Sequence, residues 1–244
     1  MVATVETLDR ASASVADIAL HFPHAIEILN KYNLDYCCNG KKRFEDVCKK
    51  HNLDPEQIWI ELLVTKGDSD MDKHARFETW NLSLLIDFIL QNHHEYVRKS
   101  IPEIRELLDK VCNAHGEDQP ALHKIRKDFN SLAEELLEHL PKEEEILFPA
   151  IKRIIQQNNG FIENSVLLAN LDKPILAMEH EHESAGDLIK SIRSLTNHYT
   201  PPAFACPTYQ ITFKMLHEFD HDLMQHIHLE NNILFPKAKM LNAK

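Results

Sequence analysis

Apolar residues recur every three or four positions along most of the chain, which is the spacing of amphipathic helices. The first stripe lies near the N-terminus and comprises Val15, Ile18, Ala19, Phe22, Ile26 and Leu29. It predicts one helix, which the polar stretch 33–40 closes. The chain therefore begins with a helical element that buries one face.

Two further helices complete a small N-terminal domain. One is expected over 43–51 and the other after Asp54, because aspartate suits the capping position and Pro55 suits the first turn of a helix. The polar, non-periodic segment 65–78 predicts a linker. The N-terminal domain accordingly spans 1–64.

The remainder of the chain, 79–244, carries four longer stripes. They predict helices over roughly 79–112, 120–157, 171–198 and 207–239. Four long helices with short connections favour an antiparallel four-helix bundle, a fold that can hold a metal site in its core. The chain has few glycines and little β-branched alternation, so we predict an all-α protein.

Composition narrows the class of protein further. With 27 Lys+Arg against 38 Asp+Glu, the net charge is −11, which argues against nucleic acid as a partner because phosphate contacts need clustered basic residues. No apolar run approaches the ~20 residues that cross a bilayer. The N-terminus lacks the basic and apolar regions of a secretory signal peptide. We expect a cytoplasmic protein with no membrane partner.

Histidine and cysteine carry the candidate chemistry. The chain has 16 histidines, and histidine is the commonest metal ligand. Its five cysteines are odd in number and do not indicate a disulfide framework. We expect reduced thiols, with structural roles for Cys48, Cys112 and Cys206, which have no partner by spacing.

The bundle sequence contains an internal repeat. The segment HLPKEEEILFP, which begins at His139, recurs as HIHLENNILFP from His226, 87 residues later. A His-Glu pair at His94 recurs 88 residues later at His182. The bundle is thus predicted to be two copies of one helical hairpin. The shared Ile-Leu-Phe-Pro favours core packing and a helix stop over a binding role.

The repeat brings six candidate ligands to the bundle centre: His94, His139, Glu143, His182, His226 and Glu230. Residues four apart lie on one helix face, so each His-x-x-x-Glu addresses one point. Nitrogen and oxygen donors suit iron, manganese or zinc. Two carboxylates can bridge two cations, so the count favours a di-iron site. A single such pair is usually a surface hydrogen bond, but two matched copies favour ligation.

Other polar residues near these ligands have candidate supporting roles. His93 fits the helix periodicity nearly as well as His94, and the match with His182 selects His94. His180 and His228 lie about 200° around their helices from the ligands, which favours solvent or supporting positions.

Three acidic residues are candidates for positions around the ligands. A carboxylate that accepts the free N–H of an imidazole orients it. Glu135 and Asp222, each four residues before a ligand histidine, are candidates for this role, and Glu181 is a candidate for lining an access path. The alternative for each is a plain solvated acid.

The segment 35–40, DYCCNG, contains two adjacent cysteines. On a polar loop, Cys37 and Cys38 could ligate a soft metal, exchange with other thiols or receive nitric oxide. The alternative is two unrelated buried small residues. A disulfide between neighbours would strain the ring it closes, so we expect free thiols.

Taken together, these motifs resemble the iron–sulfur cluster repair di-iron proteins, also called regulators of cell morphogenesis and nitric-oxide signalling. The segment YNLDYCCNG from Tyr32 is similar to the family's cysteine-bearing domain, and the rest, including LENNILFP from Leu229, is similar to its hemerythrin-like bundle. The resemblance covers nearly the whole chain. It implies an oxygen- and carboxylate-bridged di-iron centre on the six ligands named above, and functional roles for Cys37 and Cys38.

The resemblance also implies a function: repair of iron–sulfur clusters damaged by nitric oxide or peroxide, with iron supplied to the client protein and passed on by Cys37 and Cys38. One alternative is a hemerythrin-like sensor that binds dioxygen or nitric oxide, and another is an enzyme that reduces nitric oxide or peroxide.

Pro141, between His139 and Glu143, departs from a regular helix because proline removes a backbone hydrogen bond. The linker is compatible with a homodimer.

Overall fold

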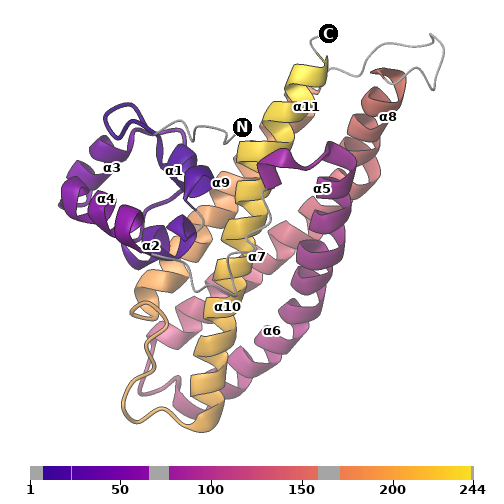
Figure 1. Ribbon diagram of the computed structural model, residues 1–244. Helices are drawn as coiled ribbons and strands as arrows, with labels where there is room; N and C mark the ends of the chain where they lie inside the picture. The colour runs from indigo at the N-terminus through magenta and orange to yellow at the C-terminus, as the bar shows by residue number, and fades with distance from the viewer. Residues whose placement is uncertain (1–7, 23, 66–76, 159–170, 243–244) are drawn as a thin grey trace. The chain divides into compact units, whose positions relative to one another are not determined.

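The computed structural model describes residues 8–22, 24–65, 77–158 and 171–242. The chain divides into two compact units, Met1–Trp80 and Asn81–Lys244, and both are helical (Figure 1). Within the described ranges there is no strand, only an isolated bridge between Ser14 and Arg43. The all-α prediction is confirmed. Most of the predicted linker, 66–76, lies outside the described residues.

Within the described residues of the N-terminal unit there are four short α-helices: α1 (Val15–His21), α2 (Ala25–Lys31), α3 (Phe44–Lys50) and α4 (Pro55–Val64). Ser14 caps α1 in a capping box with Asp17, and Asp54 caps α4 as predicted. The expectation of one long first helix is wrong, since α1 and α2 are separate. Phe22 ends α1 in an extended conformation (φ −103°, ψ 124°), because a residue before proline is disfavoured in the helical region.

Four long helices build the described part of the second unit. The 3₁₀ turn η1 (Phe77–Thr79) precedes them and falls in the first unit. The first hairpin joins α5 (Leu82–Phe88), η2 (Ile89–His94) and α6 (Glu95–His115) to α7 (Ala121–Lys142), η3 (Glu143–Leu147) and α8 (Phe148–Asn158). The second hairpin joins α9 (Asp172–Leu195) to α10 (Pro207–Leu229), η4 (Glu230–Leu234) and α11 (Phe235–Asn242). Helix α6 lies against α7 and α10, and α7 lies against α9 (Figure 1). The four spans match the prediction to within a few residues.

Three of the four long helices contain a π turn, namely η2, η3 and η4. Each closes with a hydrogen bond to the fifth preceding residue: Glu95 N–H to Leu90 C=O, Phe148 N–H to Glu143 C=O, and Phe235 N–H to Glu230 C=O. Such turns are rare and are frequent at functional sites. Here each one begins or ends at a predicted metal ligand.

The helices continue through Pro149 and Pro236, so the expectation that Ile-Leu-Phe-Pro stops a helix is wrong. A π turn shifts the hydrogen-bond register by one residue and leaves one carbonyl without a helical partner. A proline directly after the π turn has no N–H to donate, but the helix already lacks a backbone hydrogen bond at this point. The proline therefore destabilises the helix little. The expected core packing is confirmed for Phe148 and Phe235, which are buried, but not for Ile146, which is exposed.

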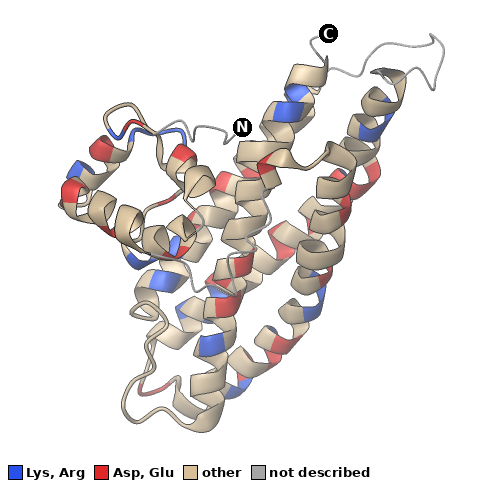
Figure 2. Cartoon of the chain, viewed as in Figure 1, with Lys and Arg blue, Asp and Glu red and all other residues tan. Residues whose placement is uncertain are grey.

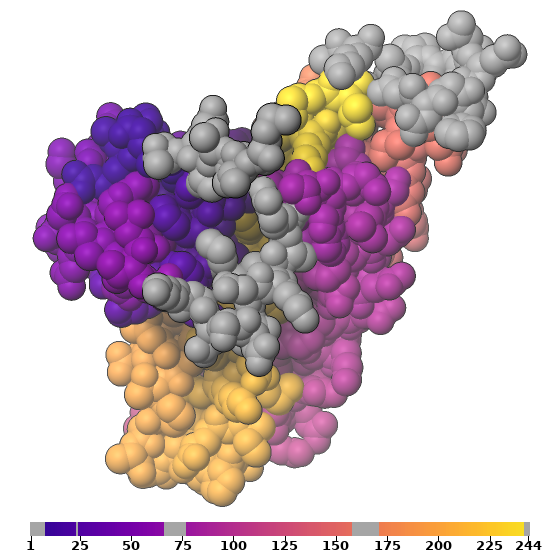
Figure 3. Space-filling view, viewed as in Figure 1, coloured from indigo at the N-terminus to yellow at the C-terminus, as the bar shows by residue number. Residues whose placement is uncertain are grey.

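Charged side chains occur on both units, with acidic and basic positions interspersed along the helices (Figure 2). In Figure 3 the side chains of α5 and α6 form a continuous surface along one side of the bundle. Among the described helices, none is both long and apolar enough to span a bilayer. The bundle interior is mostly leucine, isoleucine and phenylalanine, so its buried histidines and glutamates stand out.

Candidate metal centre

Each long helix of the bundle contributes to one buried cluster: His94 from the first, His139 and Glu143 from the second, His182 from the third, and His226 and Glu230 from the fourth. These are the six residues predicted from the repeat. Each is at most 2% exposed. Burying carboxylates and imidazoles is unfavourable unless a cation or hydrogen bonds compensate. The buried cluster therefore needs a cation or hydrogen bonds to offset the cost of its burial.

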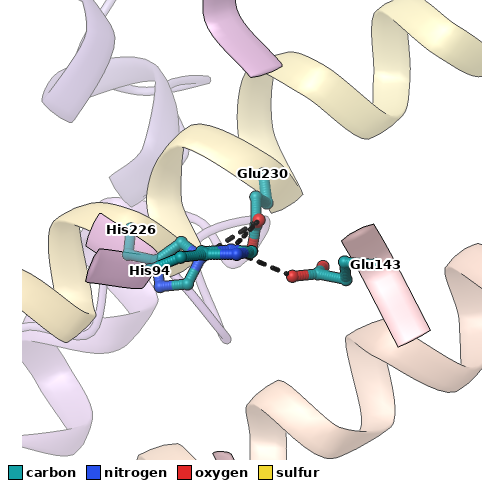
Figure 4. Close-up of side chains that lie close together, drawn as sticks. All are labelled: His94, Glu143, His226 and Glu230. Atoms are coloured by element: carbon teal, nitrogen blue, oxygen red, sulfur yellow. Dashed lines mark hydrogen bonds and ion pairs between the residues drawn. The ribbon is translucent and has the colours of Figure 1, made fainter. Parts of the chain in front are cut away.

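The first half-site consists of His94, His226, Glu143 and Glu230 (Figure 4). The Nε2 atoms of the two histidines are 3.2 Å apart. Glu230 Oε1 lies 3.1 Å from His226 Nε2, and Glu143 Oε2 lies 3.4 Å from His94 Nε2. These atoms converge from three helices, as the ligands of a single ion would.

The second half-site consists of His139, His182 and the same two glutamates. Here the histidine Nε2 atoms are 3.1 Å apart. Glu143 Oε2 lies 3.3 Å from His139 Nε2, and Glu230 Oε2 lies 3.2 Å from His182 Nε2. Glu230 thus directs one oxygen to each half-site, and Glu143 Oε2 lies between both. The two carboxylates are shared, while each half-site has its own pair of histidines.

The oxygen atoms of the two shared carboxylates fit a bound cation. Both carboxylate oxygens of Glu143, and Oε2 of Glu230, are buried and accept no hydrogen bond from the described residues. Such atoms are costly unless a positive group compensates. The donor set is nitrogen and oxygen without thiolate, which suits iron, manganese or zinc. The residues present therefore fit a divalent metal.

The two glutamates are held in the ionised form that a metal needs. Burial and repulsion by Glu230 act to raise the pKa of Glu143, but His139 and His94 outweigh them and the pKa is lowered. Burial likewise opposes ionisation of Glu230, yet His226 and His182 hold its pKa well below the usual value. Two negative charges therefore lie at the bundle centre, where a cation would be attracted.

The pKa values of the clustered imidazoles shift in different directions. Burial lowers the pKa of His226, which favours the neutral ring that ligates metals. Burial acts in the same direction on His139, but Glu143, Glu230 and Glu181 outweigh it and raise the pKa of His139 to about 9. A proton on His139 thus supplies positive charge beside the carboxylates, and a bound cation would compete with it.

Three of the four imidazoles donate Nδ1–H to an oxygen outside the cluster: His94 to Glu144 (2.7 Å), His139 to Glu181 (2.8 Å) and His182 to Asn231 (2.9 Å). These hydrogen bonds hold a proton on Nδ1 of each ring, so that Nε2 is the nitrogen that faces the cluster. Sequence reasoning missed Glu144 and Asn231. Both directly follow a shared glutamate, at matched places in the repeat, and that coincidence is the signal that could have found them.

The predicted outer acids take different positions. Glu181 accepts from His139, as described above. Glu135 instead accepts a hydrogen bond from Ser184 (2.8 Å), and Asp222 contacts His93 (2.9 Å). A spacing of four residues places an acid and a histidine on one helix face, but here a neighbouring helix supplies the partner of each acid.

His226 differs from the other three histidines of the cluster in its surroundings. The ring of His93 stacks on it in parallel, with centroids 5.5 Å apart and an interplanar angle of 5°. Its own Nδ1 is buried and has no hydrogen-bond partner among the described residues. His94 thus lies in the cluster and His93 beside it, as the repeat predicts for this neighbouring pair.

Local helix structure keeps the ligands aligned. Helix α7 continues through Pro141, and Glu143 N–H still donates to the His139 carbonyl, so this ligand pair retains its one-turn spacing. The rings of Phe148 and Phe235 pack on His94 and His182, with centroids 5.8 Å and 6.0 Å apart. The Ile-Leu-Phe-Pro segments therefore cover the ligand histidines.

Comparison with known proteins gives the cluster a context. A family model described as the hemerythrin HHE cation binding domain matches residues 85–238, and a second, a domain of unknown function (DUF542), matches residues 11–65. The chain is 35% identical to the iron-sulfur cluster repair protein YtfE of Edwardsiella ictaluri (strain 93-146) over 224 residues, 92% of this chain and 95% of that protein. It is 34% identical to YtfE of Yersinia pseudotuberculosis (serotype IB, strain PB1/+) over 234 residues, 95% and 98% of the two chains. The chain belongs to the iron-sulfur cluster repair protein family.

The resemblance seen in the sequence is thereby confirmed, and so is the hemerythrin-like character of the bundle. The match over 85–238 contains all six clustered residues. A hemerythrin domain implies non-haem iron, which agrees with the nitrogen and oxygen donors of this repair-family chain. The second model covers the two adjacent cysteines.

In this repair-family chain Cys37 and Cys38 lie on the cysteine loop, residues 32–43, between α2 and α3. Asp35 organises the loop, since its Oδ1 accepts backbone N–H groups from Cys37 (3.2 Å), Cys38 (3.0 Å) and Asn39 (3.3 Å). A Cβ at Gly40 would lie 2.3 Å from the Tyr36 carbonyl oxygen, so the loop closes only around glycine.

The two thiols of the cysteine loop have different environments. Their Sγ atoms are 3.4 Å apart. Cys37 is buried and burial raises its pKa well above the usual value, whereas Cys38 is partly exposed. With Asp35 they form a further group whose ligand atoms lie within 4.8 Å of one another. The five cysteines are free thiols, as expected.

Proposed function

We propose that the six clustered residues bind two non-haem iron ions, one in each half-site. The sharing of Glu143 and Glu230 supports this, because each half-site then has two histidines of its own and both carboxylates in common. Two carboxylates offset half of the charge of two divalent cations. Glu144, Glu181 and Asn231 would hold the imidazoles in place.

The function we propose is repair of iron–sulfur clusters damaged by nitrosative or oxidative stress, with iron supplied to the damaged protein. The relatives carry cluster repair in their names. The observation on which the proposal rests is a buried pair of half-sites built from histidine and glutamate alone. Bound iron would supply an exchangeable cation and one-electron chemistry. Ligands without thiolate hold ferrous iron less tightly, which suits an ion that must leave again.

Within this proposal, Cys37 and Cys38 pass iron to the client protein. Cys38 is the partly exposed thiol and would make the first contact, because a thiolate must be reachable to bind metal. Cys37 lies 3.4 Å behind it and Asp35 adds a carboxylate. Iron would move as ferrous ion, without a change in oxidation state.

The experiment is transfer of isotopically labelled iron from the anaerobically loaded protein to an iron–sulfur enzyme damaged by nitric oxide. We expect Glu230→Ala to lose both its iron and its repair activity. The double variant Cys37→Ser with Cys38→Ser should keep its iron and lose most of the transfer. Cys48→Ala is the matched control, since Cys48 is a buried thiol of the same unit and should leave both unchanged.

Three results would contradict parts of this proposal. Iron content unchanged in Glu230→Ala would remove the metal centre. Normal repair by the double cysteine variant would remove the transfer role of the cysteine loop. A stable adduct of the reduced protein with dioxygen or nitric oxide would favour the sensor, and sustained reduction of nitric oxide or peroxide with an electron donor would favour the enzyme.

The proposal extends to location and assembly. Five free thiols suit a reducing compartment, so we place the repair activity in the cytoplasm. The partners are proteins with damaged iron–sulfur clusters, and nitric oxide or dioxygen as small ligands. A homodimer, in which the N-terminal unit of one chain serves the bundle of another, is testable by sedimentation of the full chain.

A further inference from the structure

A second candidate site lies at the end of the bundle remote from the metal ligands. Helix α6 ends at His115 and α10 begins directly after Cys206. Because α6 and α10 run in opposite directions, these two ends meet (Figure 1). Cys206 precedes His226 by 20 residues, about 30 Å along a helix that rises 1.5 Å per residue. The pair is therefore separate from both half-sites.

Cys206 and His115 form a close nucleophile–base pair. Cys206 Sγ lies 3.4 Å from Nε2 of His115, although the two residues are 91 apart in the sequence. The His115 ring packs against the ring of the buried Tyr209, with centroids 5.5 Å apart, which holds the imidazole in place. The thiol itself is partly exposed, so small molecules in solvent can reach it.

The start of α10 adds positive potential at the sulfur. Cys206 occupies the capping position of this 23-residue helix in an extended conformation (φ −68°, ψ 166°). Backbone N–H groups at a helix N-terminus stabilise an anion. The N–H of Tyr209, and next the His115 ring, lower the pKa of the Cys206 thiol. The phenol of Tyr209 stays protonated beside them, because burial and Cys112 raise its pKa.

The other thiols with shifted pKa values move the opposite way. Burial raises the pKa of Cys37, that of Cys112, and that of Cys48 to about 11. The expectation of a purely structural Cys206 rested on the lack of a partner at short spacing. The partner His115 comes from a different hairpin, so spacing could not reveal it.

We propose that Cys206 and His115 form a reactive thiol site that is oxidised by hydrogen peroxide. The Cys206 thiolate attacks one peroxide oxygen, a sulfur–oxygen bond forms and the oxygen–oxygen bond breaks. The proton that the thiol gave up to His115 Nε2 passes to the leaving hydroxide, which departs as water. Sulfur is oxidised by two electrons to sulfenic acid, and the peroxide is reduced.

The test measures each cysteine of the full chain by mass spectrometry after timed labelling with iodoacetamide across a pH series. Labelling reports the thiolate fraction, because the thiolate is the nucleophile. We expect Cys206 to label fastest, ahead of the partly exposed Cys38. Its half-maximal pH should lie below that of the same cysteine in the urea-unfolded chain, which carries the same residues without their arrangement.

Two histidine variants and a treatment with peroxide test whether the reactivity of Cys206 depends on His115. His115→Gln should shift the Cys206 profile to higher pH, whereas His180→Gln, at an exposed histidine of the same bundle, should not. Peroxide followed by dimedone should yield one adduct, on Cys206, that Cys206→Ser abolishes. Circular dichroism checks that the variants fold. Identical profiles in the folded and unfolded wild-type chain would overturn the proposal, and so would an adduct formed first on Cys38.

Discussion

The two hairpins of the bundle supply the same ligand types to the centre but surround them with different partners. His94 of the first hairpin donates to a carboxylate, Glu144, whereas His182 of the second donates to an amide, Asn231. The difference teaches that the repeat preserves the residues that face inward. The residues one step further out have diverged in charge.

The same contrast recurs away from the metal ligands. Arg105 of the first hairpin donates to the neutral side chain of Asn130. Its counterpart 88 residues later, Arg193, donates two hydrogen bonds to the buried carboxylate of Asp220. Arg105 also lies 3.8 Å from the exposed carboxylate of Glu134. One hairpin therefore has a partly exposed contact where the other has a buried, bidentate arginine–carboxylate pair.

The largest expected effect is on iron content, and it distinguishes a residue that both half-sites share from one that belongs to a single half-site. Glu143→Ala removes a ligand of both half-sites, so we expect its iron content to fall close to zero. His182→Ala removes a ligand of the second half-site alone and should retain about half of the iron. Iron analysis after anaerobic purification measures both. Equal iron losses in the two variants would show that the half-sites do not bind independently.

Next in size is the loss of the arginine contacts. Arg193→Ala removes the positive charge that offsets the buried Asp220 carboxylate and leaves that carboxylate the Tyr199 hydroxyl as a donor. We therefore expect a loss of about 3–5 kcal/mol in the free energy of unfolding. Arg105→Ala breaks partly exposed contacts to Asn130 and Glu134 and should cost about 1 kcal/mol. Urea unfolding followed by circular dichroism compares them. A similar cost for both would contradict the contrast between the hairpins.

A smaller effect should follow from making the outer partners alike. Glu144→Gln gives the first hairpin an amide like that of Asn231, which should weaken iron binding about tenfold by lowering the basicity of His94. Glu145→Gln is the matched control, because Glu145 is an exposed neighbour. Competition with a ferrous chelator measures the change. Unaltered retention in Glu144→Gln would show that the carboxylate is not needed.

The smallest effect concerns pH. Tyr199 donates to Asp220 (2.7 Å), and burial together with Asp220 raises the pKa of Tyr199 well above its usual value. Its protonated form is favoured by folding, so its contribution is complete below about pH 10 and is lost as the pH rises through the folded value. Tyr199→Phe should be less stable at neutral pH by about 1 kcal/mol. The gap should narrow in alkaline unfolding experiments, and a constant gap would contradict the assignment.

Local spacing and the repeat were sufficient for much of this molecule. The bundle helices follow from apolar periodicity, and the convergence of the six candidate ligands follows from His-x-x-x-Glu on two matched hairpins. The separation of α1 from α2 is also local, since Pro23 follows Phe22 in the sequence. Each of these features depends on residues close together in the chain or related by a fixed offset.

Other features depend on contacts that spacing does not encode. The fifth rather than the fourth preceding carbonyl accepts a hydrogen bond in η2, η3 and η4, and apolar periodicity, which follows a regular α-helix, does not predict this. His115 and Cys206 meet because α6 and α10 are neighbours. Asp222 contacts His93 of the other hairpin and not His226 of its own helix, a pairing that spacing within one helix cannot reveal.

The π turns also set how the bundle should respond to a change in length. Each contains one residue more than an α-helical segment of the same rise, so deleting one residue from η3 would leave a regular helix of that rise. Phe148 would then stay close to its place on His94. Deleting one residue from the α-helical turn between His139 and Glu143 would instead turn everything that follows by about 100° and draw it back by about 1.5 Å. The π turn is therefore the place where this helix tolerates the loss of a residue, and the α-helical turn beside it is not.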